Sequence, residues 1–400
     1  MIWEQIRSNQ LRSSLLVILM GALLLLIGYF LGLSLLDSAI AGLLIALIVW
    51  AIMTLVAFFQ GDSILLGVAQ ARKIGPDDHP RLYNIVEEMK IASGLHTMPD
   101  VYIIDDPALN AFATGRNSSK ASIAVTSGLL QKLNRDELQG VVAHELSHVN
   151  NRDVLLMSVC AVMLGSIVLL SYYASRFMLF GGMSRSRRSS SGGGGAQIIV
   201  LVVALLLMIL APIAAQLIYF AVSRRREYLA DACSAQYTRY PEGLASALEK
   251  LASSTEQLKS ANKATAPMYI VNPFKSKGLA ASSLTSTHPS IEERIRILRA
   301  MGGASFKDYD SAYKSVKGRG GLPQSALLAG EALSIRAASG RVDNIGETEA
   351  ARARETSEAI WHSANYKTVN CECGAKFRIP PGFKSEQFVC PHCGNLNKIK

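Results

Sequence analysis

The main pattern along the chain is a set of four long apolar stretches without a charged residue. They are 22, 22, 21 and 26 residues long and cover Leu15–Leu36, Ser38–Phe59, Val154–Ala174 and Gln197–Val222. An α-helix of 21 residues reaches roughly 31 Å, which is enough to cross the hydrocarbon core of a bilayer. Because no stretch has a periodic polar face, we predict four membrane-spanning helices in place of buried core helices.

The four spans divide the chain into alternating membrane and soluble parts. The first span exceeds the apolar core of a signal peptide and a second span follows at once, so we expect it to be retained as an anchor. The predicted parts are a hairpin of two spans at 1–60, a soluble part at 61–153, a second hairpin at 154–222 with a Gly/Ser/Arg loop at 175–196, a soluble part at 223–302, a linker at 303–366 with a short helix near 347–361, and a compact tail at 367–400.

Within 61–153 the pattern changes to that of a small α+β domain. Three short apolar runs at 101–106, 110–115 and 121–126 predict strands, and the last two flank the turn-rich segment "GRNSSK". A helix is predicted next, with Asn134 as N-cap and Glu137 three residues later, as a capping box requires. Its apolar face is formed at helical spacing by Leu138, Val141, Val142 and Val149.

This predicted helix carries the sequence His144-Glu145-x-x-His148. Positions i and i+4 of a helix share a face, so both imidazoles can point at one ion, and zinc prefers nitrogen ligands at about 2.0–2.1 Å. Glu145 then lies beside the ion, where it can take a proton from the attacking water. The alternative is a pair of histidines on a helix surface with no metal.

A catalytic zinc needs a third protein ligand and one open position. Glu227 and Asp231 lie four apart in "REYLADACSAQ", directly after the fourth predicted span. We expect Glu227 to ligate the ion and Asp231 to accept a hydrogen bond from a ligand histidine. Two spans separate His148 from Glu227, and two crossings return the chain to the same membrane surface, so the ligands can converge there.

These motifs resemble the HtpX-type membrane zinc metalloproteases, which are relatives of the CaaX prenyl endopeptidases. The matching segments are "NAFATG", "VTSGLL", "HELSHVNNRD", "REYLAD" and "THPSIEERI", in that order, within residues 1–302. The resemblance implies a mainly α membrane protein with an α+β gluzincin-type peptidase domain. It also implies zinc held by His144, His148 and Glu227, with Glu145 as general base.

The resemblance implies further roles by position. The segment Asn110, Ala111, Phe112 and Ala113 matches an edge strand that pairs with an extended substrate. His288 matches a histidine that supports the oxyanion; the alternative is an ordinary residue at a helix N-terminus. The implied substrates are membrane or misfolded proteins, and the implied location is the inner membrane of a bacterium. Prenyl processing is disfavoured, because CaaX peptidases have more spans.

The tail from 367 to 400 has no counterpart in that resemblance. It contains Cys371-x-Cys373 and Cys390-x-x-Cys393, each pair followed by glycine, as in metal-binding knuckles. This resembles a zinc ribbon, in which four thiolates close a tetrahedral structural site. A redox or disulfide role is the alternative. We therefore expect two zinc ions, one catalytic and one structural.

Charge and composition restrict the remaining choices. A net charge of +10 suits loops beside anionic lipid and does not by itself indicate nucleic-acid binding. Basic residues lie both before the first span and in the 175–196 loop; the larger number beside the soluble parts favours an active site that faces the cytoplasm.

The alternative function is a non-catalytic membrane scaffold with structural zinc. A transporter finds no support, since the spans hold almost no ionisable residue. The sequence leaves substrate identity, the tail's role and oligomeric state open.

Overall fold

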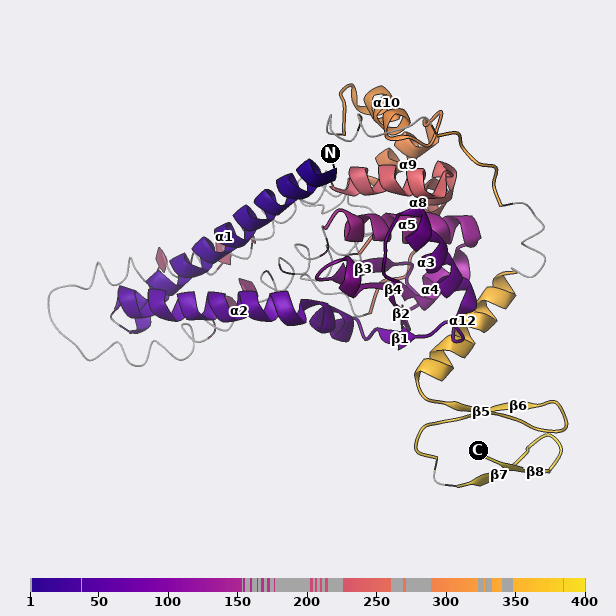
Figure 1. Ribbon diagram of the computed structural model, residues 1–400. Helices are drawn as coiled ribbons and strands as arrows, with labels where there is room; N and C mark the ends of the chain where they lie inside the picture. Colours follow the sequence, from indigo (N-terminus) through magenta and orange to yellow (C-terminus); the bar gives the residue numbers. More distant parts are fainter. Residues whose placement is uncertain are drawn as a thin grey trace.

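The computed structural model describes residues 2–36, 38–152, 226–259, 269–270, 289–322, 327, 333–339, 348–383 and 385–399, together with isolated positions between 154 and 214. These residues are mainly helical, with one small mixed sheet and two small hairpins near the C-terminus. Figure 1 shows three regions: a long helical hairpin at one end, a compact body, and the small hairpins at the other end.

The helical hairpin consists of α1 (Ile2–Leu35) and α2 (Ala39–Val68). Ser38 caps α2, because its side chain accepts a hydrogen bond from the Ala41 N–H. By length and apolarity α2 is long enough to cross a membrane, and α1 contains a shorter apolar segment at Val17–Leu33. Most side chains of α2 are exposed to the surroundings, as expected for a helix in lipid.

Small residues let α1 and α2 cross closely. A Cβ atom added at Gly28 would lie 2.3 Å from the Ala46 Cβ, and one at Gly32 would lie 2.6 Å from the Gly42 Cα. Such close contacts between backbones are typical of helix packing in membranes. The third and fourth predicted spans lie largely outside the described residues. Among those that are described, Val159, Leu164 and Ile167 are helical and pack against α1 and α2.

The body is built around a four-stranded sheet with the order β1-β2-β4-β3. Its strands are β1 (Arg72–Ile74), β2 (Asp100–Ile104), β3 (Ala111–Gly115) and β4 (Ala121–Thr126). β2 and β4 are parallel, whereas β1 pairs with β2 and β3 pairs with β4 in antiparallel register. The three predicted strands are thus confirmed, and β3 lies at one edge of the sheet.

Helices cover this sheet and enclose the main core. They are α3 (Pro80–Ala92), α4 (Ser127–Lys132), α5 (Arg135–Asn150), a helix over 226–238, α8 (Pro241–Ser253) and α9 (Ile291–Arg299). α5 contacts β3 and β4 and packs against α3 and α8, and α8 packs against α9. A Cβ atom on Gly140 would lie 2.7 Å from the Leu244 nitrogen, so glycine is needed where α5 and α8 cross.

The segment predicted as a linker at 303–366 differs from that expectation in its described parts. α10 (Phe306–Lys317) packs on α9, and its side chains Tyr309, Ala312 and Tyr313 are buried in the main core. Residues 333–339 lie against the body, where Arg336 donates to the Asp136 carboxylate and stacks on the Tyr240 ring. α12 (Glu349–Ser363), near the short helix predicted at 347–361, packs on α4.

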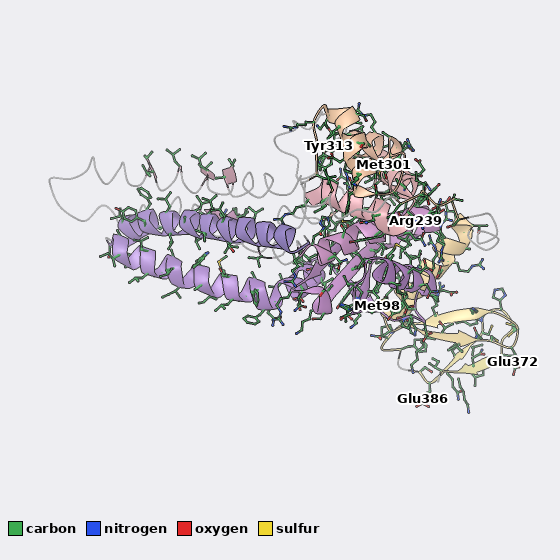
Figure 2. All side chains as sticks on the ribbon, turned by 45° about the horizontal axis from the view of Figure 1, so that its top comes forward. Met98, Arg239, Met301, Tyr313, Glu372 and Glu386 are labelled. Carbon is green, nitrogen blue, oxygen red and sulfur yellow. The ribbon has the colours of Figure 1, made fainter. Side chains whose placement is uncertain are left out.

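The tail forms two antiparallel hairpins that stand apart from the main core. The first joins β5 (Lys367–Asn370) to β6 (Lys376–Ile379), and the second joins β7 (Gln387–Val389) to β8 (Leu396–Lys398). The Phe377 and Phe388 rings meet edge to face and connect the hairpins. Figure 2 shows this unit, with Glu372 and Glu386 labelled, at the opposite side of the body from α1 and α2.

Candidate metallopeptidase site

The two histidines of the site lie on one face of α5. Asn134 and Glu137 form the predicted capping box, since each side chain accepts a hydrogen bond from the other's backbone N–H. The helix therefore starts at a fixed residue, and His144 and His148 follow on its buried side, with 1% and 5% of their surfaces exposed. Their rings meet edge to face with centroids 5.0 Å apart.

The helix over 226–238 brings the third side chain to them. The Ser234 hydroxyl donates a hydrogen bond of 2.7 Å to the Gly140 carbonyl, which joins this helix to α5 one turn before His144. Glu227 then faces both histidines. One carboxylate oxygen lies 3.5 Å from His144 Nε2, and the other lies 3.5 Å from His148 Nε2.

These distances suit a tetrahedral zinc ion. With ligands at about 2.0–2.1 Å from zinc, neighbouring ligand atoms in a tetrahedron are about 3.3 Å apart. The candidate ligand atoms of His144, His148 and Glu227 all lie within 4.8 Å of one another. Two imidazoles and one carboxylate are also the donor set of a catalytic zinc site, which leaves one position for water or substrate.

Asp231 lies behind His144 and has no exposed surface. Its Oδ1 is 3.0 Å from His144 Nδ1, a contact that places the proton on Nδ1 and leaves Nε2 for a metal. Burial lowers the pKa of His144, but the hydrogen bonds to Asp231 and Glu227 outweigh it and raise this pKa to about 9. Protons and a metal cation therefore compete for the imidazole.

Arg294 of α9 completes the charge arrangement and is also fully buried. Its Nε and Nη2 donate to the two oxygens of Asp231 at 2.8 and 2.6 Å, and its Nη1 lies 3.6 Å from Glu227 Oε2. Burial raises the pKa of Asp231, but the Arg294 guanidinium and His144 together outweigh burial and hold the pKa below its usual range. Ionised Glu145, Glu227 and Asp231 with one arginine leave a charge of −2, which a divalent cation would balance.

The sequence patterns discussed above did not reveal Arg294. A signal was present, because Ile291, Arg294 and Ile297 follow one another at helical spacing and place the arginine on the apolar face of α9. An arginine in such a position is rarely fully buried unless it is paired.

The Glu145 side chain projects from α5 towards the edge strand β3 and is buried. Burial raises the pKa of its carboxyl group; the neighbouring His144, His148 and a hydrogen bond from the Ala113 backbone act in the opposite direction. The predicted strand residues Asn110, Ala111, Phe112 and Ala113 are all buried at this edge. His288 lies outside the described residues.

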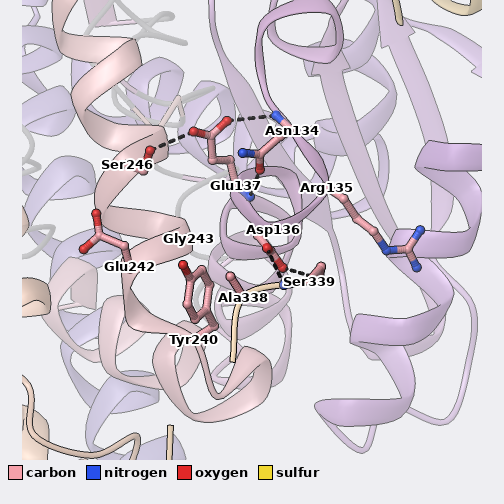
Figure 3. Close-up of a pocket in the computed structure, with 10 residues that line it drawn as sticks. All are labelled: Asn134, Arg135, Asp136, Glu137, Tyr240, Glu242, Gly243, Ser246, Ala338 and Ser339. Atoms are coloured by element: carbon pink, nitrogen blue, oxygen red, sulfur yellow. Dashed lines mark hydrogen bonds between the residues drawn. The ribbon is translucent and has the colours of Figure 1, made fainter. Parts of the chain in front are cut away.

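A hollow lies at the N-terminal end of α5, away from the two histidines, and is drawn in Figure 3. It is lined by Asn134–Glu137, by Tyr240, Glu242, Gly243 and Ser246, and by Ala338 and Ser339. The dashed lines in Figure 3 link Glu137 to Asn134 and Ser246, and Asp136 to Ser339. This hollow connects the cap of α5 to α8 and to the C-terminal segment, and it holds none of the metal-binding side chains.

Comparison with known proteins agrees with this geometry. The model of peptidase family M48 matches residues 76–302. The chain belongs to this family. It is 44% identical over 300 residues to a protease HtpX homolog of Dictyoglomus turgidum, covering 75% of this chain and 95% of the relative. A homolog of Streptococcus uberis is 41% identical over 301 residues, with 75% and 100% covered.

Among solved structures, Ste24p of S. mikatae aligns with a TM-score of 0.41 and 19% identity, over 74% of this chain and 66% of that one. The match to the family model, the identity to the HtpX homologs and the geometry of the ligand atoms identify His144, His148 and Glu227 as the zinc site of an HtpX-type M48 metalloendopeptidase. The matched range of the family model ends at residue 302, before α10, α12 and the tail.

The tail contains a second cluster that can hold a metal. The sulfur atoms of Cys371, Cys373, Cys390 and Cys393 lie within 4.8 Å of one another. Two of the sulfur–sulfur distances are 3.5 and 3.7 Å, close to the roughly 3.8 Å expected between thiolates on one zinc and far from a disulfide bond of about 2.05 Å. Gly374 and Gly394 follow the pairs with φ of +87° and +77°, so each knuckle uses the conformation that glycine allows.

Proposed function

We propose that this metalloendopeptidase hydrolyses peptide bonds with Glu145 as general base. The observation that supports the role is the position of Glu145, buried one residue from His144 and hydrogen-bonded to the edge strand through Ala113. Burial raises its pKa above the usual value of a glutamate, which suits a group that must accept a proton and then return it to the leaving amine. When bound, zinc polarises the peptide carbonyl and acidifies water.

Asp231 acts in this mechanism through His144. By accepting a hydrogen bond from the Nδ1–H group it fixes the ring's tautomer and direction, and Arg294 in turn fixes Asp231 through two hydrogen bonds. His288 supplies a further donor to the developing oxyanion in this proposal, which rests on the sequence resemblance alone.

The substrate strand is proposed to pair with β3. The Asn110 carbonyl accepts from the Thr126 N–H, so Asn110 and Phe112 direct their backbone groups towards β4. Alternate residues of a strand point the other way, which directs the backbone groups of Ala111 and Ala113 outwards from the sheet. An extended peptide added there passes beside Glu145 and the zinc site, with main-chain hydrogen bonds that do not depend on sequence.

We further propose that the chain crosses a bacterial inner membrane four times, with the active site on the cytoplasmic side. The apolar helices α1 and α2, and the packing of Val159, Leu164 and Ile167 against them, support a second hairpin beside the first. A site tied to the membrane surface suits membrane-embedded or misfolded proteins as substrates, and hence protein quality control. The four cysteines are proposed to hold a structural zinc.

Membrane proteomics tests the substrate class. Cells that express Glu145→Gln should accumulate intact membrane proteins, or hold them bound to the variant, that cells with the unaltered chain degrade. Accumulation confined to folded proteins outside the membrane would contradict the proposed substrate class. For topology, Ser191→Cys and Ser118→Cys should label from opposite sides of the membrane, and an impermeant thiol reagent on intact cells should reach position 191 alone.

A further inference from the structure

Two residues of the chain's own sequence, Tyr269 and Ile270, lie against the outer edge of β3. The Ile270 N–H donates a hydrogen bond of 3.1 Å to the Ala111 carbonyl. As argued above, that carbonyl points away from the sheet and is one of the groups with which an added strand would pair. A backbone group of the chain therefore uses a hydrogen-bonding position on the strand proposed to receive the substrate.

The other backbone group of Ile270 is held as well. Its carbonyl accepts a hydrogen bond of 3.4 Å from Nη1 of Arg294, and this nitrogen also lies 3.6 Å from the zinc ligand Glu227. One guanidinium group thus separates the Ile270 carbonyl from the metal site. On the β3 side, Ala113, two residues beyond Ala111, donates to Glu145. Ile270 thus lies against the same edge strand that contacts Glu145, and one guanidinium group separates it from a metal ligand.

The two side chains are anchored in different clusters. Tyr269 is 1% exposed and packs edge to face on Phe112, with ring centroids 5.2 Å apart, in the cluster that includes Leu65 and Leu66 at the end of α2. Ile270 is 2% exposed and belongs to the main core. The backbone bends at both residues, so that their two side chains enter different clusters.

We propose that Tyr269–Ile270 is a built-in occupant of the substrate site, held as a substrate strand is held. The Ala111 carbonyl and the Arg294 guanidinium bind the backbone of the residue beside the scissile bond, and the space filled by Ile270 accepts an aliphatic side chain. A substrate has to displace these two residues before cleavage. This inference rests on the proposed function, because it takes β3 as the strand that receives the substrate.

The test measures binding without catalysis. The probe is a fluorescein-labelled peptide with the sequence of residues 266–273, "APMYIVNP", added to the full zinc-loaded chain carrying Glu145→Gln in detergent micelles. Adding Ile270→Ala should weaken the built-in occupant and tighten peptide binding by about ten-fold, since apparent affinity scales with the fraction of open sites. Ile297→Ala is the matched control: it removes the same atoms from the same core, on α9, and should not tighten binding.

Equal or weaker binding by the Ile270→Ala protein would overturn the proposal. If that variant does not fold, the unaltered chain decides: the peptide should inhibit its cleavage of casein, and a peptide with aspartate at the Ile270 position should not. Equal inhibition by both peptides, or by neither, would also overturn it. Failure of the proposed function gives a different result, because casein cleavage would then not depend on Glu145.

Discussion

At the scale of single residues, Asp231 shows how the zinc site depends on a group that does not touch the metal. It is fully buried; both of its oxygens accept hydrogen bonds from Arg294, and Oδ1 also lies 3.0 Å from His144 Nδ1. Its carboxylate orients the His144 imidazole and makes it a better zinc ligand. Both side chains are buried from water.

Asp231→Asn should weaken zinc affinity by roughly 10–100-fold, as is usual when the partner of a ligand histidine is changed. The amide keeps the shape of the side chain but loses its charge. Competition with a fluorescent zinc chelator measures the effect, with Asp310→Asn on α10 as a control outside the site. An unchanged affinity would remove Asp231 from the proposed mechanism.

Arg294→Met should destabilise the body by about 3–5 kcal/mol, because it leaves the buried Asp231 carboxylate without its cationic partner. Arg294→Lys should recover only part of this loss, since an ammonium group cannot make the two parallel hydrogen bonds of the guanidinium. Urea denaturation of the purified protein in micelles checks both values. Equal stability of the methionine variant and the unaltered chain would contradict this electrostatic role.

The residues of the site differ in how well sequence predicts them. His144 and His148 lie four apart on a single helix, so their shared face could be derived from the helical period alone, with Glu145 next to it. Glu227 required the additional argument that it directly follows a predicted span. Arg294 was missed because its partners are 63 and 150 positions away, and its pairing with Asp231 depends on tertiary packing.

At the scale of elements, α12 is the helix that joins the cysteine tail to the body. It packs on α4, and its buried Thr356 lies 3.5 Å from Nε2 of the buried His79. Nδ1 of His79 accepts the Leu82 N–H at the start of α3. Because that nitrogen is an acceptor, the nearby Glu355 carboxylate, 3.4 Å away, forms no ion pair with it while the ring is neutral.

Docking of α12 should consequently depend on pH. Burial, assisted by Arg81, lowers the pKa of His79 from 6.5 to about 4. The unfolded state then binds more protons between these values, so stability is fully present above pH 6.5 and falls by at most about 3 kcal/mol as the pH drops through 4. Amide hydrogen exchange in α12, corrected for intrinsic rates, should be faster at pH 5 than at pH 7.

His79→Asn is the matched control, because asparagine can cap α3 but does not titrate near neutrality. Its α12 should show a smaller change in exchange between the two pH values. The same pH response in the variant and the unaltered chain would assign the effect to another group.

Sequence predicts elements well where local signals agree. The capping box at Asn134 and Glu137 and the alternation of apolar residues gave α5 and the strands β2, β3 and β4. The segment at 303–366 was expected to be a linker because it has few large apolar residues. α10 nevertheless packs with two tyrosines and an alanine on one face, which becomes evident only when α9 is in place.

At the scale of the whole molecule, the two candidate metal sites lie in different environments. The site on α5 is enclosed by the body, whereas the cysteine cluster lies in the tail, which stands apart from the body in Figures 1 and 2. Within this cluster Cys373 and Cys393 are exposed. A catalytic site keeps one exchangeable position, while four thiolates close the coordination of a structural zinc.

Purified protein should therefore contain two zinc ions per chain that differ in lability. Mild chelation should abolish proteolysis before the second ion is lost, and zinc analysis by mass spectrometry alongside an activity assay follows both. The quadruple variant with serine at all four cysteines should keep one zinc. One ion per chain, with the four cysteines oxidised, would contradict a metal in the tail.

Cleavage of casein by purified, zinc-loaded protein and by Glu145→Gln tests the central claim most directly, with zinc content measured in both. The variant should retain its zinc and its fold yet lose hydrolysis by orders of magnitude, because an amide cannot accept the proton of the attacking water. His148→Ala should instead lose the metal itself. Cleavage by Glu145→Gln at the rate of the unaltered chain, with equal zinc, would contradict the proposed mechanism.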